Sequence, residues 1–489
     1  MSQFFDQASL VMVPSGYKNG KVYSQKPLST DGELTFSRAS NATRVGPDGK
    51  LERVRTNYLL QSNQFDTTWV NTNITLTSGQ SDKDGGTNAW KISETTANSV
   101  HILLQTTSSV GMYTFSVYLK SGTKNKAMIF DGTNNLGVKF NLETKAFNSF
   151  YGTSVIYNIE ELDNGWARYS ITSPSASTAF RVYLLDDSYN LSYTGNTTNN
   201  IFIQNAQLEV SDFGATPYIP TTTAAVSVGP VSGLPRLDYS GGATCPSLLL
   251  EPQRTNIALY SEQFDNVSWL KYQATASANV AAAPDGTTSA DLLLDTAFND
   301  AHAFYRSVSG SAGTYTWSVF AKAQNNNFLI ISAYTGAHNR TWFNLSNGTV
   351  GTNTSGNTAK IENYGNGWYR CSVSRQYVSG SLIYEISTSK TDGVASYLGN
   401  GSDGTYLWGA MLEQGSHSTS YINTLSAAVT RGQELCSKTG ISSLLGQSEG
   451  TGFIEVDIQR SQDTRLPFLI GSANPVVHFF FSSRRRHTR

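Results

Sequence analysis

The chain has 489 residues and a formal net charge of −1, and only 15% of its residues are charged. This length indicates several domains, while the balanced charge gives no electrostatic case for a nucleic-acid or membrane-surface partner. Aromatic residues reach 11% and glycine numbers 42. This composition favours a β-rich, loop-rich binding protein of extracellular type over a helical enzyme.

The cysteines and the hydropathy pattern exclude further classes of protein. Cys245, Cys371 and Cys436 are widely spaced and odd in number, which indicates neither a disulfide framework nor a metal site. The first residues lack the basic region and apolar run of a secretory signal. No stretch approaches the length of a membrane span. We therefore expect no membrane partner and, for work outside a cell, export by another route.

Residues 1–54 form a lead-in of short strands or extended segments around the Gly-Pro-Asp-Gly turn at 46–49. The piece is too thin to be a domain. We expect it to pack on the module that follows it.

The rest of the chain is organised by a duplication. RTN at 55–57 returns at 254–256, and YTFSVYLK at 113–120 returns as YTWSVFAK at 315–322. The AxLE strings and NGW strings repeat in the same order. A nearly constant offset over this span predicts two copies of one module with small loop insertions.

The predicted fold is all-β, with two tandem jelly-roll β-sandwich modules: module one at 55–228 and module two at 254–431. In 113–120, alternation places Tyr113, Phe115, Val117 and Leu119 on one face of a strand. Similar short runs are separated by Gly, Asn, Asp and Ser turns, and no long helical period competes with them. Many short strands with turns between them favour two-sheet antiparallel sandwiches.

The remaining segments are predicted to be connectors and a fragment. Residues 229–253 are rich in Pro and Gly and indicate a semi-rigid linker. Residues 432–481 contain two strand patterns and then break off, which is too short for a two-sheet core. We expect a truncated sandwich fragment that the fold does not need for stability. Residues 482–489, SSRRRHTR, resemble translated sequencing-adapter read-through; a genuine basic tail is the alternative.

Several long strings resemble a known family. FSRASNATRV, LLLEPQRTN and YLWGAMLEQGSHSTSYINTLSAAVTR resemble the carbohydrate-binding-module-like tail and fibre proteins of bacteriophages and prophages, over roughly residues 8–431. Residues 451–470 look like the start of a laminin-G or concanavalin-like lectin domain. The resemblance implies jelly-roll modules at the virion surface, made in the bacterial cytoplasm without a signal peptide. It also implies host-surface or mucosal glycans and other virion proteins as partners, and a homo-oligomer such as the trimer common in fibres.

Module one departs from this pattern, because Gln204 stands where module two has Trp408 and TPYIP replaces TSYI. The departure puts equal binding by the two modules in doubt.

Two catalytic motifs match but lack their structural context. GQSEG at 446–450 fits a nucleophile elbow and GNGSDG at 399–404 fits a dinucleotide fingerprint. Both motifs require a helix to follow, and a strand pattern follows each. We predict no catalytic residue and a non-enzymatic protein. A purely structural virion decoration or assembly module stays open, as does a polysaccharide-degrading tail enzyme, because carboxylates meet in space rather than in sequence.

A comparison of the two copies separates residues of the shared scaffold from candidate ligand-binding residues. Trp69 and Trp166 have counterparts in Trp269 and Trp368, which predicts shared buried scaffold. Positions off the core that differ between the copies are better ligand candidates. A Trp beside polar groups stacks on a pyranose while the polar groups take its hydroxyls. The predicted ligand residues are Arg340, Trp342 and Asn344 in module two, Lys139 and Asn141 at matching places in module one, and Tyr118 and Phe320 in the repeated strands. The alternative is an indole covered by a loop or a neighbouring subunit.

Two further pairs repeat between the copies. His101 and His302 are expected to make structural hydrogen bonds rather than to bind ligand. Glu209 and Glu413 end the AxLE strands, where modules of this general fold sometimes bind a structural calcium. One carboxylate per module is far from the six or more oxygens that calcium takes. The metal therefore stays unassigned, and no cofactor is predicted.

Overall fold

The computed structural model describes residues 3–12, 16–173, 175–211, 214–334, 337–378, 380–440 and 442–444. Within these ranges, helix is limited to α1 (Gln3–Gln7) and the 3₁₀ turns η1 (Thr30–Gly32), η2 (Ser240–Gly242) and η3 (Ser442–Leu444). The predicted all-β fold class is confirmed. None of the helices in the described ranges is long and apolar enough to cross a bilayer.

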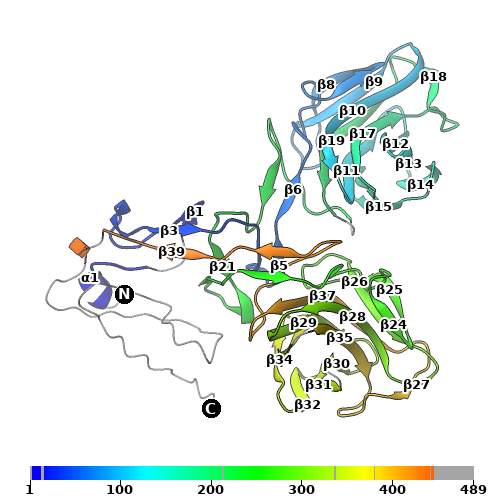
Figure 1. Cartoon of the computed structure of the whole chain (residues 1–489). Helices are drawn as coiled ribbons and strands as arrows, with labels where there is room; N and C mark the ends of the chain where they lie inside the picture. Colours follow the sequence, from blue (N-terminus) through cyan, green and yellow to red (C-terminus); the bar gives the residue numbers. More distant parts are fainter. Residues whose placement is uncertain are drawn as a thin grey trace.

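Module one is a sandwich of two antiparallel sheets (Figure 1). In spatial order, the first sheet holds β14 (Ala146–Tyr151), β13 (Leu136–Asn141), β12 (Lys126–Asp131), β17 (Ser177–Leu184), β10 (Asn98–Val110) and β18 (Ser192–Thr194), with β7 (Val70–Thr72) also paired to β10. The second sheet holds β15 (Ile156–Glu161), β16 (Trp166–Ser173), β11 (Tyr113–Ser121), β19 (Asn200–Glu209), β9 (Ala89–Glu94) and β8 (Ile74–Gln80).

Module two has the same two layers. One sheet holds β24 (Leu270–Tyr272), β28 (His302–Gly310), β35 (Gly380–Ser389), β30 (Phe328–Tyr334), β31 (His338–Asn344) and β32 (Thr349–Asn353). The other holds β25 (Ala274–Ala281), β26 (Ala290–Asp295), β37 (Gly404–Gln414), β29 (Gly313–Ala323), β34 (Tyr369–Tyr377) and β33 (Thr358–Asn363). The short strands β27 (Asn299–Asp300) and β36 (Tyr397–Leu398) pair with each other.

The two strand orders match position by position. The AxLE strands β19 and β37 hold the same place, each between the repeated YTxSV strand (β11 or β29) and the strand next to the sheet edge (β9 or β26). Both also shift register at the same point, opposite Ser116–Tyr118 in one copy and Ser318–Phe320 in the other. A bulge preserved in both copies belongs to the shared architecture.

The core of each module lies between its two sheets, where the alternating apolar residues meet. In module one, the Phe115 ring from one sheet lies 5.3 Å from the Phe180 ring of the other, and both side chains are fully buried. The repeated indoles are buried too: Trp69, Trp269, Trp166 and Trp368 are at most 4% exposed. Their prediction as scaffold agrees with this burial.

The repeated RTN strings close each module at its base. β6 (Arg55–Asn57) pairs with β20 (Val226–Val228), and β23 (Arg254–Asn256) pairs with β38 (Val429–Arg431). The buried Asn57 side chain donates to Ile219 O at 2.8 Å and accepts from Leu208 N at 3.0 Å. Asn256 makes the equivalent bonds to Ile422 and Leu412. The chain thus enters and leaves each sandwich at one point.

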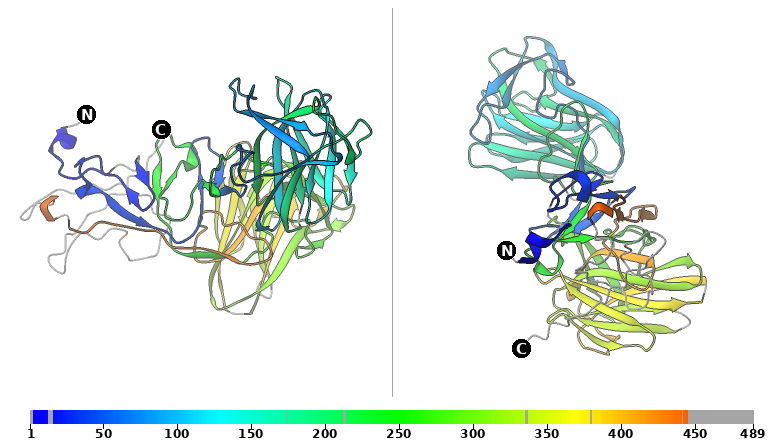
Figure 2. Two further views of the ribbon diagram at one scale, coloured as in Figure 1. Left: turned by 90° about the horizontal axis from the view of Figure 1, so that it is seen from above. Right: turned by 90° about the vertical axis from the view of Figure 1, so that its left-hand side faces the viewer.

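A third unit, which we call the hub, is built from residues 16–54, 229–253 and 432–440. It contains a sheet of β1 (Tyr17–Lys18), β2 (Lys21–Val22), β3 (Leu34–Ser37) and β39 (Leu435–Ser437), and the pairs β4 (Thr43–Val45) with β5 (Leu51–Arg53) and β21 (Arg236–Asp238) with β22 (Ser247–Leu249). The left view of Figure 2 shows it projecting to one side of the two sandwiches, where it joins the start of the chain, the linker and the strand after module two.

The expectation that the lead-in packs on module one is wrong. Leu51 is 5% exposed and belongs to an apolar cluster of module two with Phe320 and Trp408. Its backbone N–H donates to Pro284 O at 3.0 Å. Arg53 adds ion pairs to two module-two carboxylates, Glu262 at 3.1 Å and Asp285 at 2.5 Å. Alternation inside a short strand specifies its apolar residues, not the distant surface that covers them.

The hub is held to module two by a buried cluster of charges. Glu434 accepts from Arg38 at 2.6 Å and from Arg236 at 2.5 Å, and these three side chains are 0% exposed. Glu251 lies 2.8 Å from Arg236 and 2.7 Å from Arg431. Glu251 also accepts from the backbone N–H and the hydroxyl of Ser420, in a module-two loop. The five charged residues therefore connect the lead-in, the linker, module two and the segment after it.

The segment after Arg431 is consequently part of the fold, against the expectation that it is dispensable. Glu434 supplies a carboxylate to two buried guanidinium groups, and β39 pairs with β3 of the lead-in. The lectin-like pattern at 451–470 and the end at 482–489 lie outside the described residues.

A chain ending at Arg431 should be less stable than one ending at Gly440. The shorter chain leaves Arg38 and Arg236 without the Glu434 carboxylate, and breaking a buried pair in this way costs about 3–5 kcal/mol. Urea unfolding of the two shortened proteins beside Glu434→Gln measures the difference. Equal unfolding free energies for both shortened proteins would contradict this role of Glu434.

Acid should weaken the hub through Glu251. The neighbouring Arg236 and Arg431 guanidinium groups and the Ser420 hydrogen bonds outweigh burial and lower the pKa of Glu251 to about 2. Between its ordinary pKa and about 2, the unfolded chain binds a proton that the folded protein does not. The free energy of unfolding should therefore fall as pH falls from about 5 to about 2, with this residue contributing about 3 kcal/mol. Denaturant titrations across this range should show a smaller slope for Glu251→Gln, and an unchanged slope would count against the assignment.

Candidate functional site

The predicted ligand face of module two is covered by a loop. Trp342 on β31 is 6% exposed, and its indole N–H donates to Val394 O at 3.1 Å. Val394 lies in the connection between β35 and β36, which Ser389 also holds with a 2.7 Å bond to the same carbonyl. Arg340 on the same face is half-buried. A ring covered in this way has no free face for a sugar, so the covered-indole alternative describes this conformation.

The matching face of module one is covered by the equivalent loop. Lys139 donates to Tyr189 O at 3.0 Å, and Tyr189 lies between β17 and β18, the counterparts of β35 and β36. Tyr189 and Leu191 pack against Met128 and Phe130 on this outer face. Both modules thus fold the same connection over the same sheet.

Asn141 and Asn344 serve as turn residues. The Asn141 side-chain oxygen accepts from the N–H groups of Glu143 and Thr144 at 3.0 and 3.2 Å. Asn344 accepts from the N–H and the hydroxyl of Ser346 at 2.9 and 2.6 Å. This is the hydrogen-bonding habit of Asn in turns. It accounts for the recurrence of Asn at this place in both copies.

Phe320 and Tyr118 lie off the central cores, as the alternation predicts, but neither forms an open surface. Phe320 is fully buried, 5.3 Å from the Trp408 ring and 4.8 Å from the Tyr364 ring. Tyr118 is 8% exposed, with the Lys83 ammonium 4.9 Å above its ring.

The paired histidines and glutamates have structural partners. His101 and His302 bond through Nδ1 to the carbonyls of Asn73 and Gln273 at 2.7 and 2.5 Å. Glu413 accepts from the N–H and the hydroxyl of Thr419 at 2.8 and 2.7 Å, and Glu209 binds Thr216 in the same way. Among the described residues, no three or more His, Cys, Asp or Glu side chains gather in a group able to hold a metal ion.

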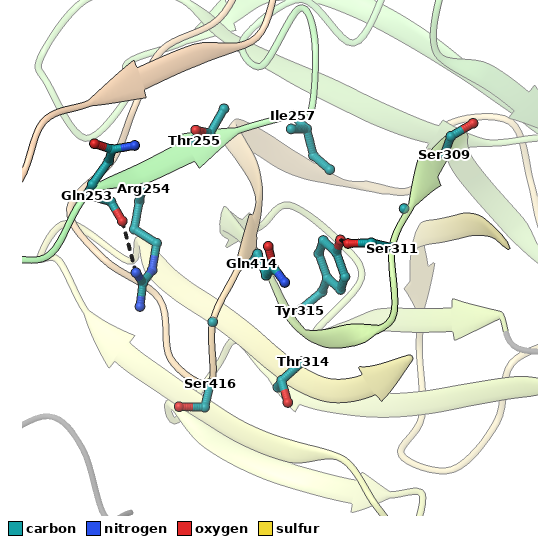
Figure 3. A pocket seen from close by; sticks show the side chains of 12 residues that line it. Gln253, Arg254, Thr255, Ile257, Ser309, Ser311, Thr314, Tyr315, Gln414 and Ser416 are labelled. Carbon is teal, nitrogen blue, oxygen red and sulfur yellow. Dashed lines mark hydrogen bonds between the residues drawn. The ribbon is translucent and has the colours of Figure 1, made fainter. Parts of the chain in front are cut away.

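A different site stands out at the base of module two, next to the hub. It is an open pocket of about 900 Å³ (Figure 3), a volume within the usual range for small-ligand sites. Three separate segments form it: the start of β23, the turn between β28 and β29, and the end of β37. The lining residues are Gln253, Arg254, Thr255, Ile257, Ser309, Gly310, Ser311, Thr314, Tyr315, Gln414, Gly415 and Ser416.

The pocket combines one rigid wall with adaptable polar groups. Tyr315 is 5% exposed because its ring packs into the module core. The Arg254 guanidinium donates to Gln253 O at 2.9 Å and lies 3.5 Å from the Glu413 carboxylate. Gln253 and Gln414 are exposed on either side. Amide, hydroxyl and guanidinium groups around an open cavity suit a ligand rich in hydroxyl groups.

The copies differ at this pocket. The repeat places Val54, Met112 and Val210 of module one where module two has Gln253, Thr314 and Gln414. Three apolar residues are thus replaced by polar ones at one end of the same scaffold. Sequence reasoning missed the pocket because its segments are far apart in the chain. Comparing the two copies position by position was the signal that could have found it.

The two catalytic patterns gain no support. Residues 399–403 form the turn between β36 and β37, and Gly404 begins β37, so a strand follows, as predicted. The other pattern, at 446–450, lies outside the described residues.

Comparisons with known proteins add little. No family model and no curated protein matches the chain. Solved structures with a likeness include a plant receptor-like kinase, FER, at 9% identity over 81% of this chain and 100% of that one, with a TM-score of 0.17. Hazelnut vicilin (Corylus avellana) has 10% identity over 74% and 87% with a TM-score of 0.10. A point mutant of Bacillus subtilis oxalate decarboxylase, OxdC, has 8% identity over 74% and 79%, with the same score. At these scores, the likenesses carry no argument.

Trp342→Ala should destabilise module two rather than act on an open binding face. Emptying the space beneath the Val394 loop should lower the unfolding free energy by about 3 kcal/mol, with a smaller loss for Trp342→Phe. Thermal and urea unfolding of the two variants measure this. Unchanged stability in the alanine variant, together with lost sugar binding, would restore the stacking role.

Proposed function

We propose that the chain is a bacteriophage virion appendage protein, of tail or fibre type, that binds host-surface or mucosal glycans without cleaving them. The polar pocket of module two is the proposed binding site. The observation that carries the proposal is the replacement of Val, Met and Val by Gln253, Thr314 and Gln414 around an otherwise repeated end of the sandwich. The family resemblance of the long repeated strings supports the virion location.

The lining chemistry matches sugar hydroxyls. The Gln253 and Gln414 amides each offer a donor pair and an acceptor. The Thr314 hydroxyl donates to the Gln376 side chain at 2.6 Å, so its oxygen is offered as an acceptor. Arg254, oriented by Glu413 and the Gln253 carbonyl, supplies further donors at the floor. Ile257 and the edge of Tyr315 provide the smaller apolar part of the wall. This mixture of a few polar groups on a shaped wall is typical of small-ligand sites.

Single sites of this kind bind weakly, because little apolar area is buried and every hydroxyl must lose its water. A virion appendage compensates by carrying many copies. If the chain forms a homo-oligomer and is held on the virion by other virion proteins, each added site raises avidity without a new contact.

Replacing the three polar residues by their module-one counterparts tests the site. The variant Gln253→Val, Thr314→Met, Gln414→Val should keep the fold, because module one folds with those residues. It should lose at least about tenfold in glycan affinity, the effect of removing a set of direct contacts. A glycan array, followed by calorimetry on the full chain, measures the change.

Trp342→Phe provides the matched control, since it alters a buried side chain away from the pocket. Unchanged binding in the triple variant would remove the pocket from the proposal. Absence of binding by the unaltered protein to any glycan would favour a structural decoration or assembly role. Release of reducing ends would favour a polysaccharide-degrading enzyme.

A further inference from the structure

Three aromatic rings group at the open side of module one, where the last strands of its two sheets, β14 and β15, end the sandwich. The Phe147 and Tyr157 rings lie 4.7 Å apart with their planes at 13°, so they stack across the gap between the sheets. Phe150 lies 4.9 Å from Phe147 and 6.0 Å from Tyr157.

A bulge in β14 places the two Phe residues on one side. Phe147 pairs with Phe140, whereas Ser149 pairs with Lys139, which leaves Asn148 as an extra residue. In a regular strand, residues three positions apart point to opposite faces. The bulge adds one residue between Phe147 and Phe150, so both point to the same face. Phe150 therefore lies opposite the buried Val138 while Phe147 lies opposite the buried Phe140.

All three rings remain in contact with solvent. Phe147, Phe150 and Tyr157 are 36%, 37% and 37% exposed, although most of the other aromatic side chains of module one are buried or half-buried. A group of mutually packed aromatic rings at the surface is a recurring mark of an interaction site.

Module two has no aromatic residue at the three matching positions. The register places Val350 opposite Phe343, Asn353 opposite Thr341, and Ala359 opposite Val373. These are the positions of Phe147, Phe150 and Tyr157 in module one. Instead, the Tyr369 ring of β34, whose counterpart in module one is Ala167, packs on the module-two core and lies beside Gly348 in the turn between β31 and β32. Module two thus closes this side with one ring from another position, and the exposed group of three rings is particular to module one.

The size of the cluster points to a small ligand. With about a third of each ring exposed, the three side chains present roughly 200 Å² of surface. A stable protein interface takes about 800 Å² from each partner. The apolar face of one or two pyranose rings fits the smaller area. Lys145, next to β14, is already paired with Glu161 at 3.4 Å, and the Glu160 carboxylate on the same strand is exposed, so the charges near the rings favour a neutral sugar over an anionic one.

We infer that Phe147, Phe150 and Tyr157 form a second glycan-binding surface, which stacks on the apolar faces of neutral pyranose rings. The inference rests on the proposed function in taking glycans as ligands, but it concerns the other module and another kind of contact. The pocket of module two binds hydroxyls through polar groups, and the edge of module one binds ring faces.

The test exchanges the rings for their module-two counterparts in the full chain: Phe147→Val, Phe150→Asn, Tyr157→Ala. Affinity electrophoresis in gels containing neutral glucan, galactomannan or xylan, with polygalacturonate as the acidic comparison, measures binding. The variant should lose at least about tenfold in affinity for a neutral polysaccharide that the unaltered protein binds. Tyr157→Phe should retain it, because the stacking face is kept. If the triple variant is unstable, the same binding measurement is made on the single variant Phe150→Asn.

The outcomes separate this inference from the proposed function. Glycan binding that survives the ring exchange but not the pocket exchange overturns the edge surface and leaves the pocket in place. Loss of neutral-glycan binding on ring exchange with the pocket intact supports it. A change of oligomeric state, measured by light scattering, with glycan binding unchanged makes the cluster a subunit contact. No glycan binding by the unaltered protein overturns both proposals.

Discussion

The arrangement of the hub depends on the cost of burying charge. Arg38, Arg236 and Glu434 are withdrawn from water entirely, and each ion removed from water without partners costs several kcal/mol. The cost is offset only if every donor finds an acceptor. Arg38 therefore also donates to the carbonyls of Pro230 and Val231, and Arg236 to that of Thr43. Because these groups come from distant parts of the chain, the cluster forms only when the lead-in, the linker and the strand after module two are in place together.

This requirement explains why some strings of the sequence are so distinctive. Glu251 belongs to LLLEPQRTN, Ser420 to TSYI, and Arg431 ends the VTR string. Module one has Pro217 and Val228 in place of Ser420 and Arg431, and it takes no part in the cluster. The strings that carry the family resemblance in module two therefore encode its attachment to the hub. They say little about what the protein binds.

The fold could be predicted from the sequence because its signals are local or repeated. Alternation in 113–120 and its copy specifies strands with one buried face, and the duplication predicts that both sandwiches share one strand order. The position of the lead-in could not be predicted in this way. The sequence identifies Leu51 only as an apolar residue of a short strand. Nothing near it in the sequence indicates the Phe320–Trp408 surface that it covers.

In the candidate sites, too, local features could be predicted and contacts with distant parts of the chain could not. Alternation correctly separates Trp342 from the central core, but the loop that covers it comes from the connection between β35 and β36, some fifty residues away. Asn344 looks like a sugar ligand in a strand pattern and is a turn residue in three dimensions. The pocket and the aromatic edge emerge only when the two copies are compared at structurally matched positions, since shared residues then account for the scaffold.

The way each module is attached has a consequence for how such a chain can change over generations. Module one joins the remainder through the adjacent strands β6 and β20 and a 3.7 Å contact of the Met112 sulfur with the Gln263 amide, and it contributes none of the five charges of the hub. A recombination event could replace it as a cassette and leave the rest of the molecule undisturbed. Module two shares its apolar surface with Leu51 and its Ser420 loop with Glu251, so a substitute must bring matching partners. A lineage carrying this architecture should therefore diversify first by exchange of module one.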